Sequence, residues 1–264
     1  MPHSLFISDL HLSANQPHGM AAFRRFIAEA TAQACPEPGK KACPEHSRRA
    51  EALYILGDLF DYWAGDDDLE DAFNAGVIAA LRSLAQHGIK AYLLRGNRDL
   101  LMGEALAGTC HATLLNDPVL IDLYGVPTLL SHGDMLCTHD TEYQRYRAQV
   151  HDADFQRQFL AKPLVERKAY IAGLRERSIA EKQSKDSAIM DVSNEAVAAL
   201  LREYGYPRLI HGHTHRPGRH EHIVDGRTCE RWVLGDWHQQ GSVLRGDSRG
   251  ISWETAAGLA SANE

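Results

Sequence analysis

Five short apolar runs of the chain each end in a cluster of Asp, His, Asn and Gly, and this repeated pattern strongly constrains the fold. Each run has the length and the residue types of a buried strand and stops at a Gly or a Ser. In chain order the runs read SLFISDLH, ALYILGDLFD, AYLLRGNRD, PTLLSHGD and PRLIHGHTH. The repetition predicts at least five strands whose ends carry polar side chains.

Helix-like stretches lie between these runs and predict an α/β architecture. Their expected ranges are 20–34, 69–86 and 192–203. Strands that alternate with helices form sheets that helices cover, and such sheets bind ligands at the carboxyl ends of their strands. Near the end of the chain, RWVLGDW, GSVLRGD and GISWETA are typical of short antiparallel strands. They indicate a second sheet or the edge of a mixed sheet.

Residues 35–51 interrupt what should be a short connection between a helix and a strand. The segment CPEPGKKACPEHSRRAE contains three Pro and several charges, so we expect a solvated loop insertion over 35–49. A metal site of Cys35, Cys43 and His46 is the alternative. Their spacing disfavours it, because it fits no standard zinc pattern.

Residues 141–190 show no strand pattern and predict a helical insert, with the core of the protein over 1–140 and 191–264. Apolar residues recur with a roughly helical period, and Pro163 breaks the region into two helical stretches. Residues 143–185 hold ten Lys/Arg against five Asp/Glu, a net charge of +5 in a chain of net charge −7. Two interpretations stay open: an ordinary solvated helix pair, or a basic and partly apolar lid (cap) that faces an anionic amphiphile.

Composition disfavours nucleic acid as a partner and gives no sign of a membrane span. The chain has 28 Lys/Arg and 35 Asp/Glu, whereas a general nucleic-acid-binding surface needs a basic surplus. The N-terminus MPHSLFISD has no basic region of a signal peptide, and no apolar run approaches the ~20 residues of a membrane span. Five Cys without a C-x-x-C pair are typical of reduced thiols. We therefore expect a cytoplasmic protein.

The polar residues at the predicted strand ends have the chemistry of a metal site. They offer carboxylate, imidazole and one amide oxygen but no thiolate, which suits Mn²⁺, Fe²⁺ or Zn²⁺. D-x-H and H-x-H each place two side chains on one face of an extended segment. One such His alone is usually an ordinary residue, whereas five clusters in order indicate a site. The candidate ligands are Asp9, His11, Asp58, Asn97, His132, His213 and His215.

The blocks DLH, GDLFD, GNRD, SHGD and GHTH resemble those of the calcineurin-like metallophosphoesterases. The resemblance implies an α/β fold, a four-layer αββα sandwich, with a centre of two metal ions. One ion would be held by Asp9, His11, Asp58 and His215. The other would be held by Asp58, Asn97, His132 and His213, so that Asp58 bridges the pair. Residues outside the ligand set would orient ligands or turns: His211, Asp61, Asp99 and Asp134.

Arg98 departs from the usual pattern of that superfamily, in which a His follows the GN of the third block. A His there can protonate an alkoxide leaving group, whereas Arg stays protonated. A phosphate leaving group needs no such proton, because its second pKa is about 6. Arg can also hold a phosphate through two hydrogen bonds. GNRD therefore favours cleavage of a pyrophosphate over cleavage of an alkyl phosphate ester.

Within the superfamily, nearly the whole chain is similar to the UDP-2,3-diacylglucosamine hydrolases of lipid A synthesis. The similar blocks are ALYILGDLFDYWAGDDD, GNRDLLMG, SHGDMLCTHD, SKDSAIMDVS and LIHGHTHRP. The resemblance implies two Mn²⁺ ions and a lipid-linked UDP-sugar, cleaved to UMP and 2,3-diacylglucosamine 1-phosphate (lipid X) by metal-activated water at the α-phosphorus. Asn97, Arg98 and His132 would be catalytic. The substrate contacts would be Asn97, Arg98, Asp140, Ser178, Lys182, Lys185 and His213.

Some of these expectations have alternatives. Ser178 and the lysines also fit a solvated helix face, and residues 35–49 have no counterpart in the usual pattern of the family. If the insert covers acyl chains, its cations face phosphates or an anionic membrane. We then expect a protein bound peripherally to the cytoplasmic face of the cell inner membrane, without an obligate protein partner. A soluble nucleotide pyrophosphatase and a non-catalytic scaffold are the rival functions. The insert disfavours the first, and the complete ligand set disfavours the second.

Overall fold

The structure is a computed structural model that describes residues 1–32, 50–182, 191–237 and 241–255. The predicted loop insertion over 35–49, with Cys35, Cys43 and His46, lies outside the described residues, and so does Lys185. Within the described ranges, no helix combines the length and the apolar character that crossing a membrane requires.

The first of two sheets has six strands in the order β11–β10–β1–β2–β3–β4. Strands β1 to β4 run parallel, and the hairpin of β10 and β11 joins the edge next to β1 in the antiparallel direction. The strand bounds are β1 (His3–Ile7), β2 (Ala50–Leu56), β3 (Lys90–Leu94), β4 (Ala112–Leu114), β10 (Ser242–Asp247) and β11 (Gly250–Thr255). The predicted strands at SLFIS, ALYIL and AYLL are therefore confirmed.

The second sheet has five strands in the order β5–β6–β7–β9–β8. Its centre is parallel, from β6 through β7 to β9, and an antiparallel strand flanks each side. The bounds are β5 (Val119–Leu123), β6 (Val126–Ser131), β7 (Arg208–His211), β8 (Gly218–Val224) and β9 (Arg227–Val233). The expected run RWVLGDW is thus antiparallel to β8 but parallel to β7. Both a second sheet and a mixed-sheet edge are present.

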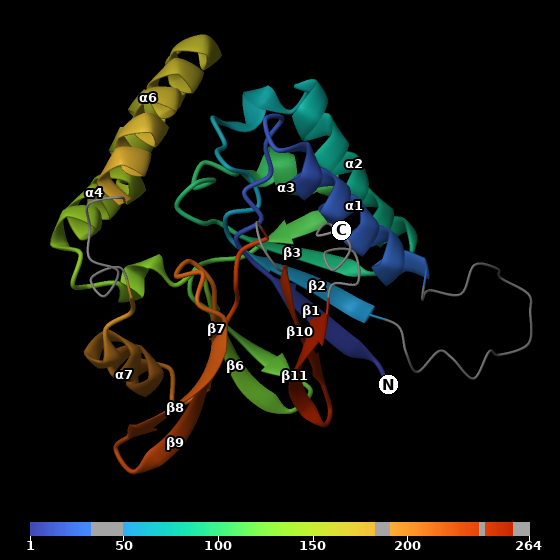
Figure 1. Ribbon diagram of the computed structural model, residues 1–264, viewed down its shortest axis with the longest axis vertical. Helices are drawn as coiled ribbons and strands as arrows, with labels where there is room; N and C mark the ends of the chain where they lie inside the picture. The colour runs from blue at the N-terminus through green and yellow to red at the C-terminus, as the bar shows by residue number, and fades with distance from the viewer. Residues whose placement is uncertain (33–49, 183–190, 238–240, 256–264) are drawn as a thin grey trace, which may run out of the picture.

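Helices cover the outer faces of both sheets (Figure 1). Helices α1, α2 and α3 lie on the first sheet, and α7 lies on the second. Their bounds are α1 (Pro17–Ala32), α2 (Ala72–Gln86), α3 (Glu104–Cys110) and α7 (Asn194–Glu203). The predicted helices are confirmed within three residues at each end. Helix α2 starts late because the Asp71 side chain accepts hydrogen bonds from the backbone N–H groups of Phe73 and Asn74.

Three apolar clusters separate the four layers. Leu5 and Ile7 of β1 pack with α1 and α2, whereas Phe6 between them packs against the second sheet. Leu129 and Leu130 of β6 divide in the same way between α7 and the first sheet. Neighbouring strand residues point to opposite faces. Strands buried on both faces are therefore continuously apolar. The two sheets pack on each other and helices cover their outer faces, which is the expected αββα sandwich.

The described residues of the insert, 141–182, form three helices, which stand beside the sandwich (Figure 1). They are α4 (Thr141–His151), α5 (Ala153–Leu160) and α6 (Leu164–Lys182). The expected break at Pro163 lies directly before α6. A second break, which the sequence analysis did not predict, falls at Asp152. Its side chain accepts a hydrogen bond from the backbone N–H of Phe155 at 2.8 Å and starts α5.

Candidate metal centre

The predicted ligands all lie in turns that directly follow strands of the two facing sheets. Those of the first sheet follow β1, β2 and β3, and those of the second follow β6 and β7. Five of them adopt left-handed backbone conformations, with φ of 56° at Asp9, 48° at His11, 53° at Asp58, 68° at His213 and 54° at His215. Such conformations are costly for residues other than Gly and are concentrated at functional sites.

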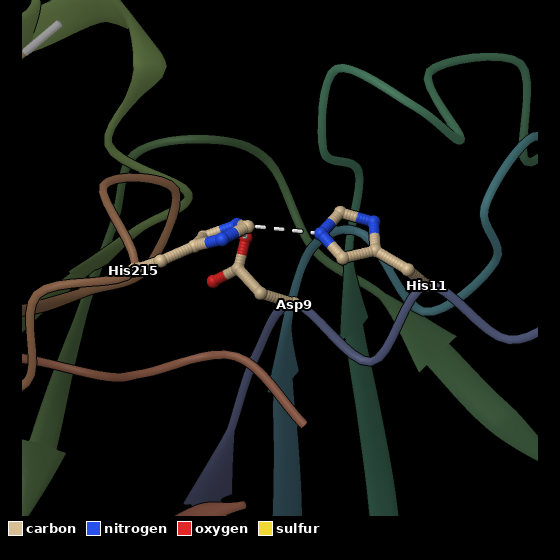
Figure 2. A group of neighbouring side chains, drawn as sticks. All are labelled: Asp9, His11 and His215. Carbon is tan, nitrogen blue, oxygen red and sulfur yellow. Dashed lines mark hydrogen bonds and ion pairs between the residues drawn. The ribbon is translucent and has the colours of Figure 1, made fainter. Parts of the chain in front are cut away.

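Asp9, His11 and His215 form one group, and their side chains point toward one another (Figure 2). Nε2 of His215 lies 3.3 Å from Oδ1 of Asp9 and 3.3 Å from Nε2 of His11. Each side chain offers a ligand atom within 4.8 Å of those of the other two. The three residues can therefore hold one ion together.

A second group lies on the other side of Asp58. Oδ1 of Asn97 lies 3.0 Å from Nε2 of His132 and 3.0 Å from Nδ1 of His213. Asp58 lies between the groups, with Oδ2 3.8 Å from His11 and Oδ1 3.8 Å from His132. Asp58 is therefore placed where one carboxylate could contact both ions. The structure thus brings together all seven predicted ligands.

Two contacts determine which ring nitrogen faces the site. Nδ1 of His132 donates a hydrogen bond to the carbonyl of Leu56 at 2.9 Å, which leaves Nε2 for an ion. Nδ1 of His215 pairs in the same way with Oδ2 of Asp236 at 3.0 Å. Sequence analysis did not identify Asp236. The signal that could have found it is the GD of RWVLGDW, which follows β9 as GD follows β2.

The turns around the ligands are held by Asp99 and by glycines. The buried Asp99 carboxylate accepts hydrogen bonds from four backbone N–H groups, among them Gly96 at 2.7 Å and Leu59 at 2.8 Å. A Cβ on Gly57 would lie 2.5 Å from Nδ1 of His132, and one on Gly96 would overlap Asp58. The Gly before Asp58 and the Gly before Asn97 are therefore needed for close packing of the ligand loops.

The other residues expected to orient ligands have separate partners. Asp134 accepts hydrogen bonds from the Tyr143 hydroxyl and from Nε of Arg147, both at 2.8 Å. Asp61 forms an ion pair with Arg175 of α6. His211 donates from Nδ1 to the carbonyl of Gly212 and lies 3.1 Å from Nη1 of Arg231 through Nε2. Both its nitrogens are thus engaged outside the ligand set.

The site favours positive charge. Burial, together with the charges of Asp99 and Asp9, raises the pKa of Asp58 to about 7. Burial would lower the pKa of His132, but the carboxylates of Asp58, Asp9 and Asp134 outweigh it and raise that pKa to about 9. Asp58 and His132 therefore hold protons that a bound cation would replace. The donor set therefore fits a centre of two divalent ions.

A cavity of about 610 Å³ opens beside the metal centre, between the core and the insert. Asn97 and Arg98 line it, next to Trp63 and Leu100. The insert contributes a largely apolar wall, formed by Tyr143, Tyr146, Val150, Phe155, Phe159, Tyr170, Ile171 and Leu174. The ring of Tyr143 also stacks on His213, with centroids 5.7 Å apart. Arg98 is therefore placed between the ligand set and an apolar space.

The remaining predicted substrate contacts differ in their placement. The Asp140 side chain accepts a hydrogen bond from the backbone N–H of Tyr143 at 3.0 Å and starts α4. Ser178 and Lys182 lie in the last turns of α6. Their contacts with substrate stay predictions.

Among the insert cations whose side chains the structure describes, five form ion pairs, which differs from the expectation that they face phosphates or a membrane. Four pair with carboxylates outside the insert: Arg147 with Asp134, Arg167 with Asp67, Lys168 with Asp68, and Arg175 with Asp61. Arg157 pairs with Asp154 inside α5. Much of the basic surplus of the insert thus serves its attachment to an acidic core.

Comparison with known proteins agrees with this geometry. Residues 3–217 match the family model of the calcineurin-like phosphoesterases. The chain is 50% identical to a UDP-2,3-diacylglucosamine hydrolase of Aromatoleum aromaticum over 94% of each chain. It is 46% identical to those of Edwardsiella ictaluri and Stenotrophomonas maltophilia, over 94% and 96% of its length and 90% and 98% of theirs. The chain therefore belongs to the calcineurin-like phosphoesterases and, within them, to the family of the UDP-2,3-diacylglucosamine hydrolases.

Proposed function

We propose that this protein hydrolyses the pyrophosphate bond of UDP-2,3-diacylglucosamine and releases UMP and 2,3-diacylglucosamine 1-phosphate. The observation that carries the proposal is the cavity that joins Asn97 and Arg98 to the apolar wall of the insert. A diphosphate bound at the Arg98 end would leave the acyl chains against that wall. The names of the relatives agree with this substrate.

Two Mn²⁺ ions are proposed as the cofactor, held by Asp9, His11, Asp58 and His215 and by Asp58, Asn97, His132 and His213. When bound, such a pair activates water for attack on the α-phosphorus and stabilises the charge that develops there. Asn97 and His132 would act in catalysis through the ion that they hold beside the reacting phosphate. The absence of any thiolate supports Mn²⁺ over a softer metal.

Arg98 is proposed to hold the phosphate oxygens, and its backbone supports this role. Its N–H donates a hydrogen bond to Oδ1 of Asp58 at 2.8 Å, which ties Arg98 to the carboxylate between the two groups of ligands. Its guanidinium can make two parallel hydrogen bonds to a phosphate and remains charged throughout turnover. The leaving sugar phosphate departs as a stable anion, so Arg98 need not donate a proton.

Further substrate contacts are proposed at Asp140, Ser178, Lys182, Lys185 and His213. His213 is adjacent to the cavity, because its ring stacks on the lining residue Tyr143. The lysines would balance the charge of the UDP diphosphate. This part of the proposal rests on the resemblance of the chain to the family, with Asp140 in SHGDMLCTHD, Lys185 in SKDSAIMDVS and His213 in LIHGHTHRP.

We further propose that the protein binds peripherally to the cytoplasmic face of the inner membrane, without an obligate protein partner. The corner between α5 and α6 supports this, because Val165 is 79% exposed and Leu160 is 41% exposed. Lys162 lies between them in sequence, and its Nζ lies 5.9 Å from the centroid of the Phe159 ring. Exposed apolar residues beside a cation suit an anionic lipid surface.

Mass spectrometry of the products in H₂¹⁸O tests the proposal. Purified protein with Mn²⁺ is given UDP-2,3-diacylglucosamine or UDP-N-acetylglucosamine, and the Asp58→Ala variant serves as the background control. We expect ¹⁸O in UMP and strong preference for the acylated substrate. Label in the sugar phosphate alone would refute attack on the α-phosphorus. Equal cleavage of both substrates would point to a soluble nucleotide pyrophosphatase instead.

A further inference from the structure

A single buried arginine connects the insert to the core loop that borders the cavity. Arg167 lies in the first turn of α6 and is only 1% exposed. Its Nε donates to the carbonyl of Lys162 at 3.0 Å, its Nη1 donates to the carbonyl of Ala64, and its Nη2 pairs with Asp67. One guanidinium thus holds the start of α6 and the core loop together.

The core loop is shaped to receive this side chain. Gly65 has φ of 135°, a backbone conformation that Gly adopts readily and other residues rarely adopt. A Cβ at this position would overlap Nη1 of Arg167. The same Cβ would lie 2.9 Å from Cδ2 of Leu160 at the end of α5. Gly65 therefore lets the backbone of the loop lie directly against the insert.

The loop continues from this contact to the metal centre. The backbone N–H of Trp63 donates to the carbonyl of Arg98 at 3.2 Å, and the N–H of Arg98 donates to Oδ1 of Asp58 at 2.8 Å. On the other side, Nε1 of Trp63 donates to Oδ1 of Asp66 at 3.0 Å. Asp66 in turn accepts from the backbone of Gly103 at 3.0 Å. A continuous series of contacts thus runs from Arg167 to Arg98.

Two other cations in the described part of α6 pair with the core, and both are less buried. The Lys168 side chain is 31% exposed and its Nζ lies 2.7 Å from Oδ1 of Asp68. The Arg175 side chain, paired with Asp61, is 28% exposed. Their carboxylate partners are buried, so both pairs also help to hold α6 on the core. Arg167 differs because it is enclosed and reaches three acceptors, two of which are backbone carbonyls.

We propose that Arg167 is a positioning residue for the reaction. It fixes the start of α6 on the loop of residues 63–67 and thereby sets the spacing between the apolar wall of the cavity and Arg98. Lysine cannot replace it, because an ammonium group cannot span three acceptors in the fixed fork of a guanidinium. The identity of the substrate in this inference rests on the proposed function. The attachment of α6 to the core loop through Arg167 does not depend on that function.

The test compares Arg167→Met and Arg167→Lys with Arg157→Ala. Arg157 is the matched control, because it belongs to the same insert and its side chain is 72% exposed. For Arg167→Met we expect KM for UDP-2,3-diacylglucosamine to rise tenfold or more, with kcat changed less than about threefold. Arg167→Lys should show a smaller rise in KM. Arg157→Ala should keep KM and kcat for the acylated substrate within about twofold of wild type. Every variant should also hydrolyse the unacylated diester bis(4-nitrophenyl) phosphate at a rate within about twofold of wild type.

Amide hydrogen exchange gives a second measurement that does not depend on activity. Exchange in α5 and the start of α6 should quicken at least tenfold in Arg167→Met, while exchange in β1, β2 and β3 stays unchanged. Unchanged exchange in α6 would overturn the proposal. Equal loss of both activities, with loss of metal, would also overturn it, since that is the result of general unfolding. If Arg167→Met does not fold, Arg167→Lys, which keeps the charge, takes its place. The proposal is then tested by the rise in KM for the acylated substrate and by the exchange rates in α5 and α6 of that variant. If wild type does not cleave the acylated substrate, the proposed function fails, and exchange alone decides on the attachment.

Discussion

Nδ1 of His215 lies 3.0 Å from Oδ2 of Asp236, and this contact turns Nε2 of the same ring toward Asp9. A carboxylate behind a metal-binding His fixes the orientation of the ring and makes it a stronger ligand. The two residues come from different turns of the second sheet, after β7 and after β9. Asp236 therefore contacts the candidate metal centre without belonging to the predicted ligand set.

Replacing Asp236 should weaken metal binding without abolishing it. For Asp236→Asn we expect a loss of about 10–100-fold in metal affinity, because the ring of His215 loses its orienting charge. Titration of metal-free protein with Mn²⁺ measures the effect, and Asp225→Asn, at an exposed ion pair with Arg202, is the control. Wild-type affinity in Asp236→Asn would show that the contact has no influence on the site.

Removal of Asp58 should be far more damaging, because its two oxygens face His11 and His132 from opposite sides. For Asp58→Ala we expect fewer than two ions per chain and almost no activity. Asp61→Ala should keep both ions, since Asp61 pairs with Arg175 of the insert. Elemental analysis of dialysed protein checks both variants. Two retained ions in Asp58→Ala would exclude the bridging role.

Metal binding should release protons and strengthen as the pH rises. In the metal-free protein the pKa of His132 is raised to about 9. Hydrogen bonds that the His215 ring donates to Asp236 and Asp9 outweigh burial and raise the pKa of His215 to about 9. Both rings must lose a proton to bind an ion, so affinity should increase from pH 6 to pH 9, up to tenfold per pH unit for each proton released. Calorimetry in buffers of different ionisation enthalpy counts these protons. Affinity that does not vary with pH would contradict the charge state assigned here.

The same pKa shifts predict how the stability of the metal-free protein depends on pH. A His whose pKa is raised on folding stabilises the fold fully below its unfolded pKa of about 6.5. That contribution disappears as the pH rises through about 9, the folded pKa of His132 and His215. The melting temperature of metal-free protein should therefore fall between pH 6.5 and pH 9, and added Mn²⁺ should oppose the fall. A melting temperature that rises over this range would refute the linkage.

The sequence predicted the ligand set because each ligand follows a strand that is apolar on both faces. Such runs are rare outside buried parallel strands, and a His or Asp at the end of each is informative. Strand β8, GRHEHIV, was missed because it lies at the edge of its sheet and presents exposed polar residues such as Arg219 and Glu221. Strand β4 was missed because it has only three residues.

Contacts between distant segments could not be predicted, since a local pattern does not name a partner. The net charge of the insert gave no sign that Arg167 pairs with Asp67, which lies 100 residues earlier in the chain. The three Asp residues of GDDD look like a solvated turn in the sequence. In the structure they divide between the cap of α3, Arg167 and Lys168. The same limit concealed the contact between His215 and Asp236.

Arg98→His should lose pyrophosphate hydrolysis by at least about 100-fold, because a neutral imidazole cannot hold phosphate oxygens as a charged fork does. Metal content should stay at the wild-type level, since the hydrogen bond to Asp58 comes from the backbone of Arg98. Steady-state kinetics with UDP-2,3-diacylglucosamine measures the loss. Wild-type kcat/KM in this variant would show that Arg98 does not bind the diphosphate.

The apolar wall of the cavity should make catalysis strongly dependent on the length of the acyl chains. Phe155, Phe159, Ile171 and Leu174 line the cavity, whereas Val165 of α6 faces outward. Each methylene buried against the wall contributes up to ~0.8 kcal/mol, so chains shorter by several carbons should reduce kcat/KM by orders of magnitude. Leu174→Ala should reduce kcat/KM for long-chain substrate, while Val165→Ala should leave it unchanged in detergent micelles, where no membrane is present. The measurement is kcat/KM across a series of diacyl substrates in mixed micelles. If UDP-N-acetylglucosamine is cleaved as well as the longest chain, the wall does not bind lipid and the cavity serves a soluble nucleotide.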